Sequence, residues 1–234
     1  MMDLSNGPRL GIFGSLLMLL SMVLMLAIGL FITVAVLAAV YPSAVGANGL
    51  GSNSINETQV MQQAQNATAT VLGQFLVPIM ADLLIEIAGV VLLALSFSAF
   101  GKEHKDQKTV RYGYYGAALI VAALIIELIG PASLSIVVFV LMLVGFLFYM
   151  MVLGYISKAA SANKLRYYGY GLALGAVLNL INPLGTIVFI VVFALMALGF
   201  RNISKSGGIR GRPSPFDTAQ ITSDASLKKR KGKK

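Results

Sequence analysis

The sequence predicts an all-α membrane bundle of six transmembrane helices, arranged as three hairpins with both termini in the cytoplasm. Three observations lead to this prediction. The 234-residue chain is 57% hydrophobic and 12% charged, and its mean hydropathy of +0.82 lies outside the range of soluble globular domains. Several apolar runs approach or exceed the roughly 20 residues that a helix needs to cross a bilayer. The Lys and Arg residues flank these runs on one side only.

The placement of the basic residues predicts the orientation. Arg9 precedes the first apolar run, and the stretch 41–73 contains no Lys or Arg. Basic residues then occur only between the second and third runs, between the fourth and fifth, and after the sixth. Those between runs are Lys102, Lys105, Lys108, Arg111, Lys158, Lys164 and Arg166. Because positive charge accumulates on the cytoplasmic side, the chain is predicted to be N-in and C-in.

The first span is predicted over 10–41 and to end at Pro42. It is far longer than the apolar region of a signal peptide, which runs roughly 7–15 residues, so we expect it to be retained. At 1.5 Å per residue it could reach about 48 Å. We therefore expect this helix to tilt or to project beyond the bilayer.

The polar segment 42–70 is predicted to lie outside the cell. A helix capped by Ser54 or Asn56 is expected to continue from it into the second span, 71–100, with Pro78 as a kink or interruption. The remaining spans are separated by proline turns or charged loops. They are predicted over 112–130, 132–156, 167–182 and 184–200.

The fifth and sixth spans are short. At about 16 and 17 residues they reach only about 25 Å. Such helices either thin the bilayer locally or form a re-entrant pair, and we expect true spans.

The last two hairpins look like copies of each other. Each begins with Arg-Tyr followed by Tyr and Gly residues, from Arg111 and from Arg166, and each ends with a Gly-Phe pair, at Phe146 and Phe200. Arg9 with the residues after it resembles a third, more diverged copy. Because each unit contains two spans, such repeats would be related by rotation about the membrane normal.

Three acidic residues lie within apolar runs: Asp82, Glu86 and Glu127. Asp82 and Glu86 share one helix face, and Glu86 and Glu127 are both expected about 21–23 Å from the cytoplasmic boundary. Asn179 is the repeat partner of Glu127, at about 18 Å. A charge at the bilayer centre costs about 2.5–3.5 kcal/mol on insertion scales, so such residues face the bundle interior or water.

Two interpretations of these residues remain open. The four side chains form a proton or cation site open to the outside, or they are structural. In the structural case Glu127 snorkels beside the outer turn, and the other two acids are protonated or bonded to polar neighbours. The apolar runs contain no basic residue that could pair with them.

Two glycosylation sequons, at Asn56 and Asn66, fall in the segment predicted outside. Metal, cofactor and enzyme chemistry have little support, because the chain has no Cys and its single His, His104, is expected to be solvated in a charged loop. The glycine-rich tyrosine clusters are expected to pack helices together and not to bind a ligand.

The tail 201–234 is rich in Ser, Gly, Pro, Lys and Arg and is predicted to be disordered. Its last residues are predicted to lie against anionic lipid headgroups, at roughly 1 kcal/mol per basic residue. They are Lys228, Lys229, Arg230, Lys231, Lys233 and Lys234. Nucleic acid is not an expected partner, because every basic residue flanks a span or lies in this tail.

The opening Arg9-Leu10-Gly11-Ile12-Phe13-Gly14-Ser15-Leu16-Leu17 resembles that of small archaeal multi-pass membrane proteins of unassigned function. The Arg-Tyr starts and the Gly-Phe pairs of the last two hairpins, which read Arg-Tyr-Tyr-Gly and Leu-Gly-Phe in the third, share the resemblance, whereas the outer segment and the tail do not. The resemblance implies an archaeal source and no mechanism.

The leading functional prediction is a non-enzymatic scaffold or accessory subunit of a membrane assembly, as a homo-oligomer or within a larger complex. The alternative is a small channel or a proton- or cation-coupled transporter that uses Glu86 and Glu127.

Cysteine labelling on this cysteine-free chain tests the orientation. A reagent that cannot cross the membrane should modify Ser52→Cys in intact cells, because that position is predicted outside. It should modify Lys105→Cys and Ser161→Cys only after permeabilisation. Labelling of Lys105→Cys in intact cells would overturn the orientation.

Overall fold

Six α-helices make up most of the chain that this computed structural model describes, which is residues 6–46, 57–160, 162–181 and 184–205. A short 3-10 helix, η2 (Ala132–Leu134), precedes α4, and the described residues include no strand. The helices are α1 (Gly7–Gly46), α2 (Glu57–Glu103), α3 (Gln107–Ile129), α4 (Ser135–Ala159), α5 (Lys164–Ile181) and α6 (Leu184–Lys205).

Five of these helices are long and apolar enough to cross a membrane, namely α1, α2, α3, α4 and α6. The protein is therefore a helical multi-pass membrane protein. The fifth predicted span corresponds to α5, which is not among the five. Its 18 residues include Lys164, Arg166 and three tyrosines in the first two turns, and these lower its hydropathy.

Two predicted boundaries are wrong. α1 continues past Pro42 to Gly46. A proline removes one helical hydrogen bond, and near a helix end that loss does not stop the helix. α6 continues past Arg201 to Lys205, so the first part of the predicted disordered tail is helical. This extension buries Ile203 against the core.

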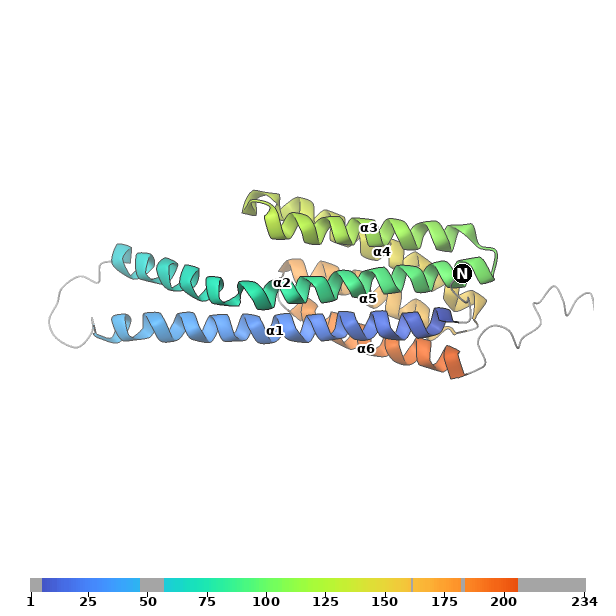
Figure 1. The fold of residues 1–234 in the computed structure, drawn as a ribbon, viewed down its shortest axis with the longest axis horizontal. Helices are drawn as coiled ribbons and strands as arrows, with labels where there is room; N and C mark the ends of the chain where they lie inside the picture. The colour runs from blue at the N-terminus through green and yellow to red at the C-terminus, as the bar shows by residue number, and fades with distance from the viewer. Residues whose placement is uncertain (1–5, 47–56, 161, 182–183, 206–234) are drawn as a thin grey trace, which may run out of the picture.

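The prediction of one continuous helix from the outer segment into the second span is confirmed. α2 runs over 47 residues with Pro78 inside it. Its ribbon bends between the cyan and green parts (Figure 1), as a proline within a helix causes. Its expected cap, Ser54 or Asn56, lies outside the described residues.

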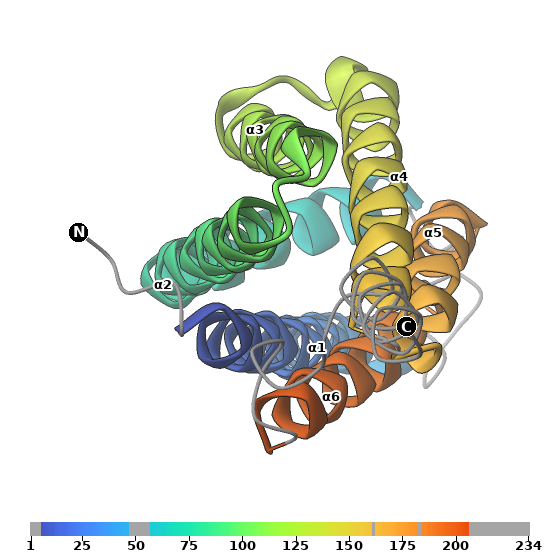
Figure 2. The same ribbon diagram turned by 90° about the vertical axis from the view of Figure 1, so that its right-hand side faces the viewer.

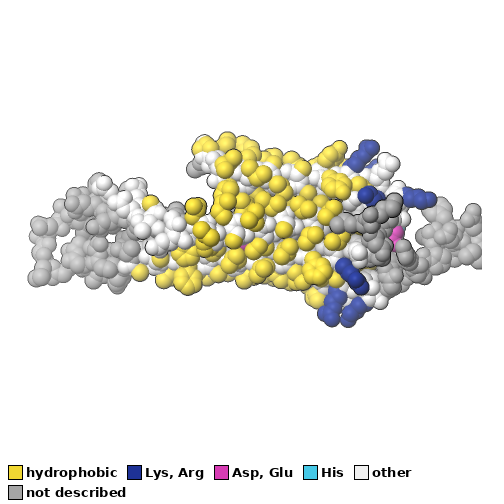
Figure 3. All heavy atoms as spheres, viewed as in Figure 1, with side chains coloured by type: hydrophobic (Ala, Val, Ile, Leu, Met, Phe, Trp, Pro, Cys, Tyr) yellow, Lys and Arg dark blue, Asp and Glu magenta, His cyan; other side chains and the backbone are white. Residues whose placement is uncertain are grey.

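The helices form a closed ring. Each helix contacts the next one in the sequence, and α6 contacts α1, as the view along the bundle shows (Figure 2). In the space-filling view, Lys and Arg side chains gather at one end of the visible face (Figure 3). Among the described residues, this end carries the turns that join α2 to α3 and α4 to α5.

Aromatic side chains from alternate helices fill the interior of the ring. Phe97 of α2 meets Tyr149 of α4 edge to face, with ring centroids 5.0 Å apart, and lies 6.5 Å from Phe200 of α6. All three side chains are fully buried. The Tyr149 hydroxyl donates a hydrogen bond to the Val90 carbonyl oxygen at 3.1 Å, so this buried polar group is satisfied.

Glycines bring the helices of two hairpins into backbone contact. A Cβ placed on Gly14 of α1 would lie 3.0 Å from the Gly89 carbonyl oxygen of α2. A Cβ on Gly116 of α3 would lie 3.0 Å from the Gly145 carbonyl oxygen of α4. Gly116 belongs to the first tyrosine cluster, so the expectation that the glycines of these clusters pack helices together is confirmed for it: the space for a side chain is taken by the neighbouring backbone.

α1 extends beyond α6 at the end opposite the basic residues (Figure 1). Gly11 of α1 lies against Phe200 of α6, and sixteen residues separate Phe200 from Leu184, where α6 begins. Because the two helices are antiparallel, the same count outward from Gly11 reaches Ala27. The part of α1 from residue 28 onward therefore projects past α6.

α2 projects past α3 in the same direction. Phe97 of α2 lies against Gly113 of α3, and sixteen residues lead from Gly113 to Ile129 at the end of α3. The same count outward from Phe97 reaches Ala81. We call residues 28–46 and 57–81 the arm.

Glycine substitutions in α4 test the backbone contact. Gly145→Ala should destabilise the protein by about 1–3 kcal/mol, because the new Cβ would meet Ile120 Cγ1 at 2.6 Å and the Gly116 carbonyl oxygen at 3.0 Å. Gly154→Ala is the matched control in the same helix, since a Cβ there meets nothing within 4 Å. It should be neutral or gain up to about 1 kcal/mol. Thermal unfolding followed by circular dichroism in detergent measures both, and equal effects would contradict the packing account.

Candidate functional site

Asp82 and Glu86 lie on the buried face of α2. Asp82 is 2% exposed and Glu86 is 7% exposed. Their spacing of one turn places both carboxyl groups on the same side of the helix. Leu83 and Ile87, beside them in the sequence, pack against the hydrophobic core. The sequence-based expectation that these acids face the bundle interior agrees with this burial.

Ser21 of α1 faces the carboxyl pair. Met18 lies against Gly89, with Met18 Sδ 3.0 Å from where a Cβ on Gly89 would be. In this antiparallel pair, three residues outward from Met18 is Ser21, and three residues outward from Gly89 is Glu86. Ser21 is fully buried, and its side chain lies next to the Asp82 carboxyl group.

The contact between Ser21 and Asp82 is close but is not a well-formed hydrogen bond. The Ser21 hydroxyl and the Asp82 carboxyl group are near enough to be hydrogen-bond partners if distance alone is considered. By distance and angle, however, neither Ser21 Oγ nor Asp82 Oδ1 has a partner among the described residues. A hydrogen bond weakens steeply away from its preferred geometry. Both atoms are therefore buried without a partner.

No basic side chain is available to these carboxyl groups from their own hairpin. The part of α2 from Glu57 to Gly101 contains no Lys, Arg or His, and the single charged residue of α1 is Arg9, at the start of the helix. Asp82 directly follows Ala81 and so lies level with the last turn of α3. The pair thus sits at the base of the arm.

Glu127 of α3 lies beside the pair and not in it. Its side chain is exposed on the surface of the bundle, yet it is near enough to Glu86 for the two charges to interact. An exposed acid near the end of a membrane helix can extend toward the headgroups.

The structure does not bring Asn179 to the carboxyl pair. α5 packs against α4 and α6, and the exposed Asn179 side chain accepts a hydrogen bond at 3.1 Å from Thr186 Oγ1 of α6. Asn179 therefore stabilises the turn between α5 and α6. Equivalent positions in similar hairpins lie on different sides of the ring, which explains why the repeat pattern did not place it correctly.

Sequence reasoning missed Ser21. The signal was present, because Ser15 and Ser21 are small polar residues in the middle of a long apolar run. Both are fully buried, and both hydroxyl oxygens lack a partner. Only the packing of α1 on α2 shows that Ser21, and not Ser15, is level with the acids.

The expectation that His104 is solvated is wrong for part of its ring. His104 lies in the turn between α2 and α3, and its Nε2 atom is buried without a hydrogen-bond partner among the described residues. In the same turn Lys105 has a φ of 55°, and Asp106 caps α3 by accepting a hydrogen bond from Lys108 N at 3.0 Å.

Of the predicted modification and lipid sites, only Asn66 is described. It is exposed on α2 within the arm. Asn56 and the basic cluster at 228–234 lie outside the described residues.

A double-mutant cycle tests the role of Asn179. Asn179→Ala and Thr186→Val each remove one side of their hydrogen bond, so the double variant should lose no more stability than either single variant. The coupling should be about 0.6 kcal/mol, typical of hydrogen bonds between membrane helices, measured by unfolding in detergent. Additive effects of the two substitutions would show that this bond does not form.

Comparison with models of protein families, with characterised proteins and with solved structures found no match for this chain. The functional proposals below therefore rest on the geometry of the chain itself.

Proposed function

We propose that this protein is a non-enzymatic accessory subunit of a membrane assembly, with six spans and both termini in the cytoplasm. The packing of α5 supports a total of six spans. α5 contacts both α4 and α6, and as a span it would return the chain to the outer side before α6 begins. The gathering of Lys and Arg at one end of the bundle supports the orientation (Figure 3).

We also propose that the ring arose from three copies of one hairpin. Phe97 of α2 and Phe200 of α6 each follow a small residue near the basic end of their helix. Gly11 of the first hairpin lies against Phe200 of the third, and Gly113 of the second lies against Phe97 of the first. The same Gly-Phe contact thus occurs at two of the three junctions between hairpins, as rotation about one axis would produce, whereas at the third junction Gly169 lies against Met150.

The arm carries the proposal of an accessory role. Its described surface includes large apolar side chains that are more than half exposed: Leu30, Phe31, Val34, Leu37, Leu76 and Val77. From Arg9 to Phe31 the helix rises about 33 Å, and to Leu37 about 42 Å, compared with about 30 Å of hydrocarbon. Apolar surface therefore continues past the hydrocarbon.

An exposed apolar surface outside the membrane marks a contact with another protein. The two helices of the arm also support each other, since the rings of Phe31 and Phe75 lie 6.4 Å apart. The arm thus presents a braced apolar surface on the outer side. The partner that fits it is another membrane protein with an apolar outward-facing surface.

Enzymatic activity has no support in the residues at hand. The chain contains no Cys and one His. The described residues hold no group of three or more His, Cys, Asp or Glu close enough to bind a metal ion.

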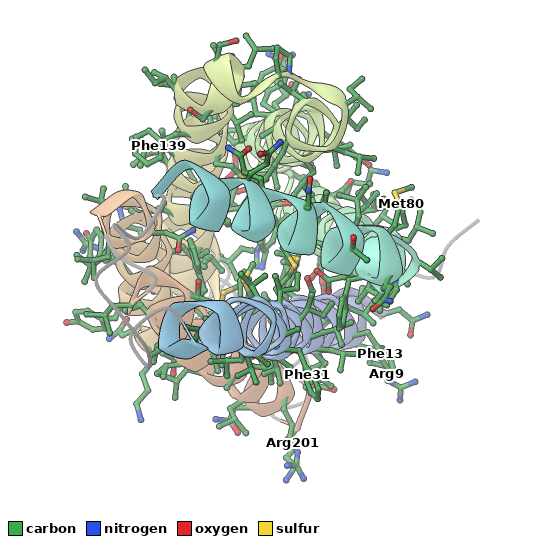
Figure 4. The ribbon with its side chains drawn as sticks, turned by 90° about the vertical axis from the view of Figure 1, so that its left-hand side faces the viewer. Arg9, Phe13, Phe31, Met80, Phe139 and Arg201 are labelled. Atoms are coloured by element: carbon green, nitrogen blue, oxygen red, sulfur yellow. The ribbon has the colours of Figure 1, made fainter. Side chains whose placement is uncertain are left out.

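Site-specific photo-crosslinking tests the docking role. Phe31 and Phe13 lie on the same helix and are 68% and 61% exposed (Figure 4). Phe13 is about 6 Å from Arg9 along the helix, within the hydrocarbon, whereas Phe31 is beyond it. With benzoylphenylalanine at each position in native membranes, position 31 should give one discrete adduct with a second polypeptide, and position 13 should give lipid adducts only.

The outcomes of this experiment are distinct. Lipid adducts alone at position 31 would overturn docking through the arm. An adduct between two copies of this chain would replace the accessory role with a homo-oligomer.

A further inference from the structure

We propose that Ser21, Asp82 and Glu86 form a proton-binding site at the base of the arm, which exchanges protons with the aqueous phase on the outer side. This site goes beyond the docking role and does not depend on it.

The polar atoms of this site are buried and unpaired. Asp82 and Ser21 are almost completely buried, and Asp82 Oδ1 and Ser21 Oγ have no hydrogen-bond partner in the described part of the chain. Buried polar atoms in native proteins are nearly always paired, and an unpaired one needs an explanation. A hydroxyl that lies next to an unpaired carboxyl oxygen supplies a donor and an acceptor for a mobile proton.

The negative charge of the Asp82 and Glu86 carboxylates needs a neutralising partner. A carboxylate in hydrocarbon needs a cation or a proton to neutralise it. The described groups that interact with the pair are Ser21 from α1 and the acid Glu127 from α3. The Tyr149 hydroxyl of α4 donates to the Val90 carbonyl oxygen instead. None of these is a cation.

A proton fits the site better than a metal ion does. The described acids form no group of three that could hold a metal ion. Two carboxylates one turn apart repel each other when both are charged, and one bound proton removes that repulsion. The step is a simple transfer, in which a hydronium ion in the outer water gives a proton to a carboxylate oxygen, an O–H bond forms and a water molecule is left.

The position of the site determines the side with which it exchanges protons. Asp82 is level with the last turn of α3, and the arm begins at the next residue outward. Inward from Glu86, the close contact of Gly89 with Met18 and the buried Val90 and Leu93 separate the pair from the cytoplasmic end. Protons therefore reach the pair from the outer side.

Binding should couple to stability with a definite sign. Release of the proton leaves charged carboxylates in a site without a cation, so the folded protein binds more protons than the unfolded chain. Its stability should therefore fall as the pH rises through the range in which the pair loses its proton.

Infrared spectroscopy of the full-length protein in lipid nanodiscs tests the proposal. Wild type should show the carbonyl band of a protonated carboxylic acid at neutral pH, and the band should disappear as the pH is raised. Asp82→Asn with Glu86→Gln should lose the titrating band, while Glu103→Gln, the control at the cytoplasmic end of α2, should keep it. If the double variant loses its helical circular dichroism, the two single variants are measured in its place.

Further variants separate this site from its neighbours. Ser21→Ala removes the polar hydroxyl that lies next to the Asp82 carboxyl group and could turn toward the carboxylate once the proton has left, so it should move the midpoint of the titration to higher pH. A band that is absent from wild type, that survives in the double variant, or that is lost in Glu127→Gln alone would overturn the proposal. Loss of the band on addition of Na⁺ at constant pH would overturn the proton as the ligand.

Discussion

Backbone contact between neighbouring helices is the constraint on which the rest of this structure depends. In a bilayer the lipid tails are as apolar as leucine, so helices associate through close packing and not through the hydrophobic effect. Gly14 with Gly89 and Gly116 with Gly145 supply that packing within the first two hairpins. Hairpins held this closely place their aromatic residues toward one axis, where Phe97 and Tyr149 meet edge to face. The ring then closes through the contact of α6 with α1.

The same contact creates the carboxyl site. The pair Asp82 and Glu86 begins one turn outward from Gly89, where the backbones of α1 and α2 are closest. Ser21 and Asp82 are buried in this interface, with oxygen atoms that lack a hydrogen-bond partner among the described residues. A buried polar group is costly in proportion to its isolation, and membrane proteins keep such groups where function requires them. The interface between α1 and α2 thus contains both the close helix packing and the proposed proton site.

Unequal helix lengths divide the first hairpin into two parts. Its inner half is one of three hairpins in the ring, and its outer half projects as the arm. The second hairpin ends in an apolar turn between α3 and α4, where Ile129 and Ile136 are strongly exposed, as suits a segment that ends within or close to the hydrocarbon. The carboxyl pair lies where the hairpin leaves the ring. Its charge state bears on how firmly α1 and α2 hold together at the base of the arm, and so links the proposed proton site to the proposed docking surface.

The sequence by itself determined the features that depend on local composition and period: the apolar helices, the basic end, the continuous helix through Pro78, and the shared face of Asp82 and Glu86. The tertiary structure alone decided which residues meet. It brought Ser21 to the acids, left Glu127 exposed beside them, bonded Asn179 to Thr186, and extended α6 to bury Ile203. The physical reason is that a membrane helix is apolar on all sides, because lipid and protein interior favour the same side chains. Its sequence therefore does not mark the face that points inward, and only the register between helices assigns each side chain to lipid, to a neighbour or to the site.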